Sequence, residues 1–501
     1  MKKICFFLQR RFTPIGVALA HEMQEKHPGT TFCAYVDTRA KYAFLKEQTV
    51  SPFTSFLVEQ DVHEKVGEEK IDSTYLKWLE KEYGIPNLWP YLYIDRVVMN
   101  GQLLREYPHD TPMLSYDDML KKLQVTARAL IEFLEREKPD SVVTSVVGSV
   151  GSMLLYHIAK KKSIQTIHIE FARIGNRIVL TDDYRTFTWV QSRFIELQNG
   201  ASSTHRDQAK KFITEFRSAP APYDFDTAND AYDTSRLKNL HFLHPKNLFR
   251  SIFWHIQTLF KDISRVKSAD YTHVFIWWST WDKIGRKIRA LRGYQGFYFD
   301  HRAYTGRYAY YPLHVEPEIA MLLYAPYYTN QVELIRATAR SLPIDMLLFV
   351  KEHPGMSGYR TRAYYKEITK IPNVRLISPG VSGNQLAQGA ALTVTITSTS
   401  GWESLLLKKP VITFGDVYYN DIPGVLTCRS FEELPFMVKK QLEEWHHDEQ
   451  VLENYVCALI EDSVDVYFAD MWNRATGLDE LLKDHGIKDL AHLFAKKTGL
   501  T

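Results

Sequence analysis

Short apolar runs alternate with longer amphipathic segments along most of the chain. Near the start, the apolar run Ile4–Leu8 is followed by an amphipathic segment over residues 14–26 and by a second apolar run over Thr31–Val36. Apolar runs of this length, rich in β-branched residues and bounded by turn residues, are typical of buried parallel strands, and the segments between them are typical of helices. The pattern predicts strand–helix–strand units, the repeating element of doubly wound α/β domains.

The same pattern returns twice further along the chain. A second unit has strands at 141–145 and 164–169. A longer series follows, with strands predicted at 274–278, 308–314, 343–351, 373–378, 392–397 and 410–414. We therefore expect an α/β protein with two Rossmann-like, doubly wound domains facing a central cleft. The predicted domains are residues 1–275 with helical insertions and residues 276–470, followed by a helical tail over residues 471–501.

Polar turns close two neighbouring strands of this series. The strand ending at Lys351 runs into Glu352-His353-Pro354-Gly355, and the strand ending at Thr397 runs into Ser398-Thr399-Ser400-Gly401. Ligands of such sheets bind at the carboxyl ends of the strands. Hydroxyls, a helix N-terminus and a neighbouring lysine and histidine suit an anion. Taken singly, each turn also fits an ordinary helix cap or strand end; together they favour a phosphate or nucleotide site.

Other glycines and acids leave alternatives open. Gly148, Ser149 and Gly151 follow a strand and either line a cleft or only permit a tight turn. The first loop, residues 9–16, lacks the spaced glycines of a dinucleotide fingerprint, which disfavours a Rossmann dehydrogenase. No Asp-x-Asp pair lies near the predicted anion turns, and Asp182-Asp183 has no spacer, so we expect no metal and no bound cofactor.

Composition narrows the class of protein. Hydrophobic residues make up 45% of the 501 residues and charged residues 24%, which is typical of a globular chain. A formal net charge of +3 gives no indication of nucleic-acid binding. Four scattered cysteines and the lack of a long apolar run lead us to expect a cytoplasmic protein. The basic amphipathic segment over 248–266 either rests on the inner face of a membrane or packs on its own domain.

Several stretches of the second half resemble one family when taken in order. They are Tyr311-Pro-Leu-His-Val-Glu-Pro-Glu318, Val350-Lys-Glu-His-Pro354, Gly358-Tyr-Arg360, Pro372-Asn-Val374, Thr397-Ser-Thr-Ser-Gly-Trp-Glu-Ser404 and Lys409-Pro-Val-Ile-Thr-Phe-Gly-Asp416. Together they resemble the capsule polysaccharide biosynthesis family of bacterial glycosyltransferases, which includes Kdo transferases. The resemblance covers about a quarter of the chain strongly, and it implies a GT-B architecture.

The resemblance also implies roles for individual residues. The donor nucleotide is expected on the carboxyl-terminal domain, with His353 at its phosphate and Glu316 near the cleft. His353, Glu316 and Asp182 are our candidate catalytic residues. The donor-binding candidates are Lys351, Glu352, Pro354, Arg360, Ser398, Thr399, Ser400, Gly401 and Glu403. A base or nucleophile across the cleft is also needed; Asp37, Glu170, Asp182 and Asp300 are candidates that the sequence does not rank.

The expected reaction is sugar transfer from a nucleotide-sugar donor to a polysaccharide or lipid-linked glycan acceptor. The first candidate for the donor is a CMP-activated acidic sugar such as Kdo, as the resemblance implies. A non-catalytic subunit that binds a nucleotide sugar or glycan, a glycerophosphate-polymer transferase and a nucleotide-sugar epimerase are the alternatives. The acceptor is expected on the amino-terminal domain, and a peripheral contact with the inner membrane is expected for the basic segment.

Overall fold

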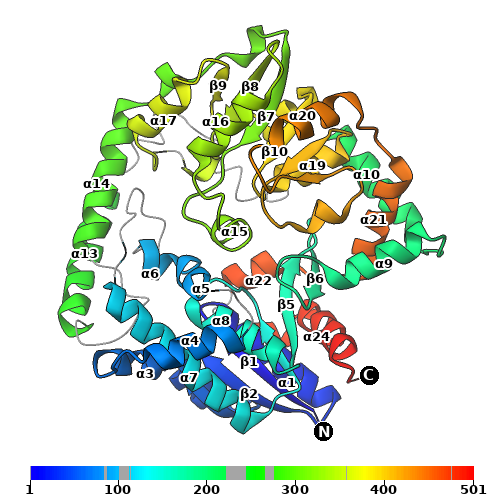
Figure 1. The fold of residues 1–501 in the computed structure, drawn as a ribbon. Coiled ribbons are helices and arrows are strands. Elements are labelled where there is room, and N and C mark those ends of the chain that lie inside the picture. Colours follow the sequence, from blue (N-terminus) through cyan, green and yellow to red (C-terminus); the bar gives the residue numbers. More distant parts are fainter. Residues whose placement is uncertain are drawn as a thin grey trace.

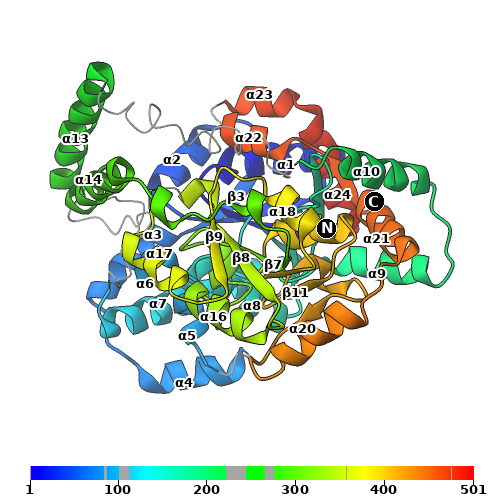
Figure 2. The ribbon, with the colours of Figure 1, turned by 90° about the horizontal axis from the view of Figure 1, so that it is seen from above.

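Two sheets, each covered by helices, build the molecule (Figure 1; Figure 2 gives the view from above). The computed structural model describes residues 2–83, 87–100, 112, 114–221, 244–265, 276–356, 358–474 and 477–500. The first sheet has the order β13-β6-β5-β4-β1-β2-β3, with β1 to β5 parallel and β6 and β13 antiparallel to their neighbours. Its strands are β1 Lys3–Leu8, β2 Thr31–Val36, β3 Phe53–Val58, β4 Ser141–Thr144, β5 Gln165–Phe171, β6 Arg177–Thr181 and β13 Ser463–Asp465.

The second sheet is parallel throughout and has the order β12-β11-β10-β7-β8-β9. Its strands are β7 Arg307–Pro312, β8 Met346–Lys351, β9 Val374–Ile377, β10 Leu392–Thr395, β11 Val411–Thr413 and β12 Leu426–Thr427. Strand β7 lies between β8 and β10, so the turns after β8 and β10 flank the end of β7 at one edge. These two sheets confirm the predicted class, an α/β protein of the GT-B type with two Rossmann-like domains.

Helices fill the connections between the strands. In the first half they are α1 Phe12–Lys26, α2 Arg39–Glu47, α3 Glu59–Glu64, α4 Ser73–Glu82, α5 Trp89–Tyr93, α6 Arg96–Asn100, α7 Tyr116–Glu137, α8 Val150–Lys161, α9 Thr188–Gln198 and α10 Arg206–Ser218. In the second half they are α13 Pro245–Arg265, α14 Ile276–Arg292, α15 Ile319–Leu322, α16 Gln331–Ser341, α17 Arg362–Thr369, α18 Gly383–Gly389, α19 Thr399–Leu406, α20 Leu434–Glu443, α21 Glu449–Glu461, α22 Phe468–Arg474, α23 Leu478–Lys483 and α24 His485–Thr498.

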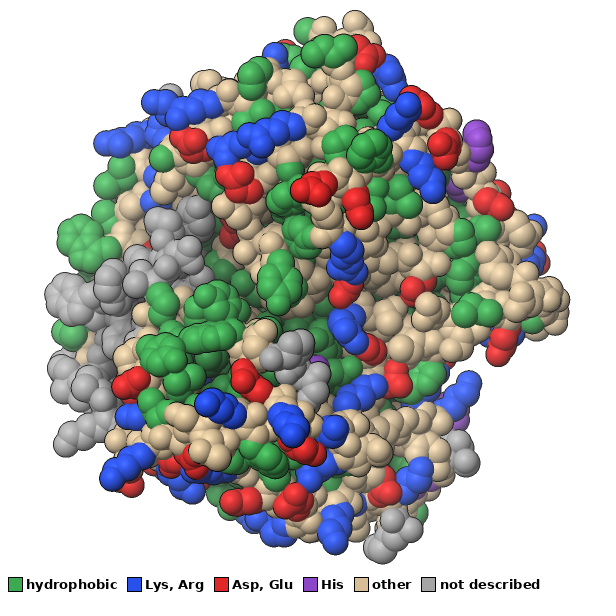
Figure 3. Space-filling view, viewed as in Figure 1, with side chains coloured by type: hydrophobic (Ala, Val, Ile, Leu, Met, Phe, Trp, Pro, Cys, Tyr) green, Lys and Arg blue, Asp and Glu red, His purple; other side chains and the backbone are tan. Residues whose placement is uncertain are grey.

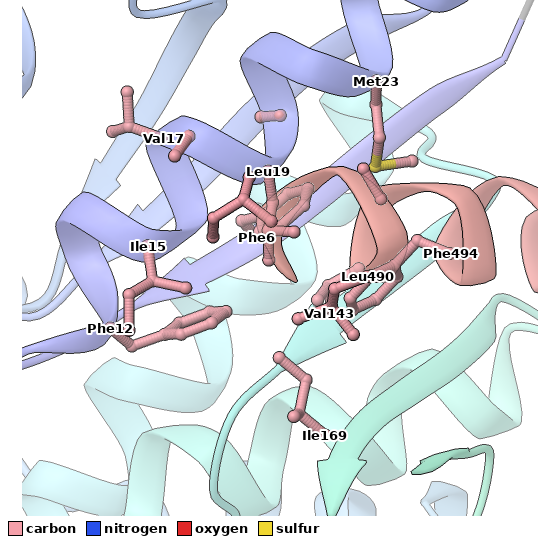
Figure 4. Packing of buried hydrophobic residues seen from close by; sticks show 14 of the residues in the cluster. Phe6, Phe12, Ile15, Val17, Leu19, Met23, Val143, Ile169, Leu490 and Phe494 are labelled. Carbon is pink, nitrogen blue, oxygen red and sulfur yellow. The ribbon is translucent and has the colours of Figure 1, made fainter. Parts of the chain in front are cut away.

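The end of the described chain returns to the first sheet. Strand β13 pairs with β6, and α24 packs on α1 across the apolar core of the amino-terminal domain. Figure 4 shows Leu490 and Phe494 of α24 against Phe6 of β1 and Leu19 of α1. All four side chains are fully buried. The predicted tail is therefore helical, and its apolar face completes the amino-terminal core.

The structure corrects three sequence predictions. Residues 276–278, predicted as part of a strand, belong to α14, and residues 274–275 lie outside the described residues. Strand β3 lies between the strands predicted at 31–36 and 141–145, where no strand was predicted. Strand β13 lies inside the stretch predicted as the carboxyl-terminal domain but is part of the first sheet. Strand β13 has only three residues, and only the two end residues of β3 are buried, so neither strand leaves a clear apolar run in the sequence.

Replacement of Phe494 by alanine tests the closure of this core. We expect Phe494→Ala to lower the free energy of unfolding by about 3–5 kcal/mol, because it removes a fully buried ring and leaves a cavity. Urea unfolding followed by fluorescence measures the change. His492→Ala, on the exposed face of the same helix, is the control. Equal stability of the two variants would contradict the packing described here.

Candidate functional site

A buried cluster of charges lies beneath the turn that follows β8. The guanidinium of Arg360 donates hydrogen bonds to Glu352 and to Glu316, the latter at 3.1 and 3.2 Å. The Arg360 and Glu352 side chains are completely buried, and Tyr365 donates its hydroxyl to Glu352 at 2.6 Å. Burial raises the pKa of Glu316, and the charge of Arg360 opposes that rise. Glu352 and Arg360 thus hold the turn in place and do not line its surface.

His314, just beyond the end of β7, connects this cluster to the second turn. Its backbone carbonyl accepts a hydrogen bond from Arg360, and its Nε2 accepts one from the backbone N–H of Thr397 at 3.1 Å. Burial and the charge of Arg360 lower the pKa of His314 to about 3, so the ring is neutral and keeps Nε2 as an acceptor. Glu352 in turn accepts from the backbone N–H of His353 at 2.6 Å. One chain of hydrogen bonds therefore fixes both strand-end turns.

The second turn is the amino-terminal cap of α19. Ser398 accepts a hydrogen bond from the N–H of Ser400 through its hydroxyl, as the sequence predicted for a cap. Tyr419 donates its hydroxyl to the Ser398 carbonyl at 2.6 Å. A Cβ on Gly401 would lie 2.2 Å from that hydroxyl, so only glycine fits there. Thr399 and Ser400 are half-buried, and the first turn of α19 presents its N–H groups at the strand end.

Lys351 and His353 lie on either side of Glu352 and differ in exposure. Lys351 is buried, and its Nζ donates to the carbonyls of Glu352 and Pro379 at 3.1 and 3.4 Å. Burial lowers the pKa of Lys351 to about 8, although the carboxylates of Glu352 and Glu403 oppose that shift. His353 is exposed, and its Nδ1 accepts from the N–H of Gly355 at 3.1 Å. In the neutral ring the proton then lies on Nε2, so that Nε2 is the donor of the ring.

The acids predicted across the cleft have different surroundings. Glu170 of β5 accepts a hydrogen bond from Tyr324 of the other domain at 3.3 Å, and burial raises its pKa to about 7. Asp182 accepts from the Thr188 hydroxyl and lies 3.8 Å from Lys160, both within its own domain. Asp37 accepts from the N–H of Arg10, and Asp300 is an exposed cap of a short 3₁₀ helix. Of these four, Glu170 is the acid that the structure places at the domain interface in a form able to exchange a proton near neutral pH.

Sequence reasoning missed His314 as a connecting residue. It lies inside the matched stretch 311–318, but its contacts to Arg360 and Thr397 span 46 and 83 residues. Spacing patterns in a sequence relate residues that are close along the chain, so they do not predict contacts over such distances. Within the described part of the chain, no group of three His, Cys, Asp or Glu side chains could hold a metal ion. In that same part, no helix is long and apolar enough to cross a membrane.

Both strand-end turns lie in one parallel α/β domain, and the sequence comparison finds a family model that matches this part of the chain. Residues 299–445 match the family model described as "Capsule polysaccharide biosynthesis protein". This segment contains β7 to β12 and both turns, so the carboxyl-terminal domain is similar to the capsule polysaccharide biosynthesis family. The resemblance inferred from the motifs is confirmed.

One curated relative and several solved structures are similar to parts of the chain. "Protein FixF" of Sinorhizobium fredii is 30% identical over 116 residues, which cover 23% of this chain and 27% of that protein. The chain thus spans about a quarter of that relative's length. Thermosulfurimonas dismutans KpsC, beta Kdo 2,7 transferase, is 12% identical over 66% of this chain and 80% of its own, with a TM-score of 0.36. UDP-GlcNAc 2-epimerase of Neisseria meningitidis is 11% identical over 92% of this chain and 99% of its own, with a TM-score of 0.24.

Removal of the Arg360 charge tests the buried cluster. We expect Arg360→Gln to lower the free energy of unfolding by about 3–5 kcal/mol, because it leaves the buried carboxylate of Glu352 without its partner. Urea unfolding of the purified protein gives this value. Arg340→Ala, on the exposed surface of α16, is the control and should change stability by less than about 0.5 kcal/mol. A small effect of Arg360→Gln would show that the cluster does not hold the domain together.

Proposed function

We propose that the protein transfers a sugar from a nucleotide-sugar donor to a glycan acceptor. The observation that carries this proposal is the chain of hydrogen bonds from Thr397 through His314, Arg360 and Glu352 to His353. It fixes an exposed histidine and a helix N-terminus at the ends of β8 and β10, the two strands that flank β7, inside the segment that matches the capsule family model. Such an arrangement suits the phosphate groups of a nucleotide.

Sugar transfer from a nucleotide donor requires the protein to stabilise the leaving phosphate. As the bond between sugar and phosphate breaks, negative charge develops on the phosphate oxygens. Preorganised donors lower the barrier most where such charge develops. His353 Nε2 and the N–H groups at the start of α19 are the donors proposed here, and the cation of Lys351 adds a favourable field. Glu316, partly exposed beside Arg360, is the candidate acid on this side of the cleft.

The donor and acceptor follow from the family as proposals. The capsule biosynthesis family supports a polysaccharide or lipid-linked glycan as acceptor. We keep a CMP-activated acidic sugar as the first candidate for the donor. Asp182 and Glu170 are the predicted candidates for the group across the cleft, and of these two Glu170 contacts the other domain.

Nucleotide binding and the His353→Ala variant test the donor site together. We expect one nucleotide among CMP, CDP, UMP, UDP and GDP to raise the thermal midpoint of the wild-type protein, because it binds only the folded state. His353→Ala should unfold at the same temperature without ligand but lose nucleotide-sugar turnover by about 10²–10³-fold. His446→Ala, an exposed histidine between α20 and α21, is the matched control.

The outcomes separate the candidate functions. A selective shift with CMP would support the acidic-sugar donor, and a shift with UDP or GDP would keep a transferase with another donor. Turnover of a nucleotide sugar to its epimer, without any acceptor, would replace the proposal by an epimerase. Binding without any turnover would favour the non-catalytic subunit. Unchanged turnover in His353→Ala would remove His353 from the donor site.

Helices α13 and α14 offer a surface for a membrane. They pack on each other, with Nζ of Lys283 3.4 Å from the centre of the Trp254 ring, and lie along one edge of the molecule (Figure 1). The apolar side chains that α13 exposes are Leu248, Phe249, Ile252, Phe253, Ile256 and Leu259. Residues 245–265 contain four Lys or Arg and one Asp. Because exposed apolar and basic side chains share one helix, we infer that it lies on an anionic membrane surface.

Two charge substitutions test this surface. Phe249→Asp combined with Phe253→Asp should weaken the free energy of binding to vesicles of phosphatidylglycerol and phosphatidylethanolamine by about 3 kcal/mol or more, because two apolar rings no longer enter the membrane surface. Sedimentation of the protein with the vesicles measures this binding. The soluble activity should stay unchanged. Phe431→Asp, an exposed ring on the other domain, is the control. Equal sedimentation of the wild type and the double variant would count against a membrane contact.

A further inference from the structure

A polar pocket lies at the carboxyl edge of the first sheet. Its walls come from the loops after β1 and β4, from helix α3 after β3, and from helices α6, α7 and α22, and it encloses about 90 Å³. The polar lining is Gln9, Arg10, Glu59, His63, Asp95, Arg96, Lys122 and Ser149. Ile319 of α15 forms part of its wall, so the pocket lies between the two domains, where Figure 3 shows the surface hollowed. This edge is where ligands of parallel sheets bind.

The pocket adjoins the turn after β10, which is part of the proposed donor site. Ile319 follows directly on the stretch that carries Glu316 and Glu318. The next residue, Ala320, accepts a hydrogen bond at its carbonyl from the Thr397 hydroxyl at 3.1 Å. Thr397 immediately precedes the Ser398 cap. A Cβ on Gly148 would lie 2.4 Å from Ile319, so glycine is needed for this close approach of the domains.

Glu59 is a buried acid in the pocket wall. Its side chain is 5% exposed, and its Oε1 accepts the Tyr35 hydroxyl at 2.7 Å. Burial raises the pKa of Glu59 to about 7; Asp37 and Asp95 add to the rise, whereas Lys122 and the Tyr35 hydroxyl oppose it. A Cβ on Gly151 would lie 2.3 Å from the same carboxylate oxygen. The Gly/Ser turn after β4 therefore both lines a pocket and leaves space for this acid.

His63 supplies an independent sign of a ligand. It is 9% exposed, and its Nε2 has no hydrogen-bond partner among the described residues. That nitrogen lies 3.8 Å from Oε1 of Glu59, beyond hydrogen-bond distance. Burial and the nearby charge of Lys122 lower the pKa of His63, so the ring is neutral. A buried polar atom without a partner, on a side chain that lines a pocket, calls for a polar group on the ligand.

We propose that this pocket holds the acceptor hydroxyl and that Glu59 is the carboxylate that removes its proton. The proposal rests on the proposed sugar transfer. In a direct displacement, the acceptor O–H bond breaks and its proton moves to Glu59. The acceptor oxygen forms a bond to the anomeric carbon, while the bond from that carbon to the nucleotide phosphate oxygen breaks and the phosphate keeps the electron pair. His63 Nε2 hydrogen-bonds the incoming sugar, and Glu59 returns its proton to solvent after the product leaves.

The pH dependence follows from the charges around Glu59. The groups that face it are Tyr35, Asp37, His63, Asp95 and Lys122, with Arg10 and Arg96 at the pocket wall. Only the deprotonated carboxylate accepts a proton. The rate should therefore rise with pH and level off above about 7, where Glu59 is ionised.

Azide distinguishes a base from a structural residue, because it attacks carbon without losing a proton. The assay follows nucleotide release from CMP-, UDP- and GDP-linked sugars with water as the acceptor. Glu59→Gln, close in shape to the acid, should release nucleotide about 10²–10⁴-fold more slowly and lose the rise towards pH 7. In Glu59→Ala, sodium azide should raise the rate of nucleotide release at least tenfold above the rate of the same variant without azide. Mass spectrometry should then detect a glycosyl azide as the product. Glu64→Gln, on the exposed face of the same helix, is the control.

The result separates the two proposals. A wild-type protein that neither binds a nucleotide nor releases one would overturn the sugar transfer and this inference with it. Normal nucleotide-induced thermal shifts in Glu59→Gln, with a wild-type rate and pH profile, would overturn the role of Glu59 alone. Slow release without azide rescue in a folded Glu59→Ala would also overturn it, since such a loss indicates a structural role.

Discussion

The interaction on which the carboxyl-terminal domain depends is the pairing of Arg360 with the buried carboxylate of Glu352. Removal of a guanidinium and a carboxylate from water costs several kcal/mol for each charge, and only close partners offset that cost. Here the offset comes from Glu316, Tyr365 and the carbonyl of His314 as well as from the pair itself. Because Glu352 follows β8 whereas His314 and Glu316 follow β7, these charges can be satisfied only when the two strand ends are in register.

That requirement explains why an exposed histidine can be held so firmly. The side chain of His353 is exposed, but its backbone N–H donates a hydrogen bond to Glu352 and its ring accepts one from the N–H of Gly355. On the other side, Thr397 is bound both to His314 and to Ala320 of α15. The loop of α15 reaches the amino-terminal domain at Gly148 and through Tyr324 at Glu170. A shift of one domain against the other would therefore displace residues at the carboxyl ends of the strands in both sheets.

The sequence predicted many of the strands and the cap of α19, but few of the contacts between residues that are distant along the chain. Buried strands such as β1, β8 and β10 were readable because four to six apolar or β-branched residues stand together between turn residues. The Ser398 cap was readable because capping is local. The bond between Arg360 and Glu316 spans 44 residues, and Glu59 follows a short strand in a charged region, so neither leaves a periodic signal.

The return of the chain to its first domain has a consequence for synthesis. The apolar face of α1 is covered by α24, so the amino-terminal core stays open until residue 494 has been made. The apolar clusters around the carboxyl-terminal sheet, by contrast, contain no residue beyond 460. The domain made second is thus expected to fold first on the ribosome, while the one made first exposes apolar surface and depends on chaperones.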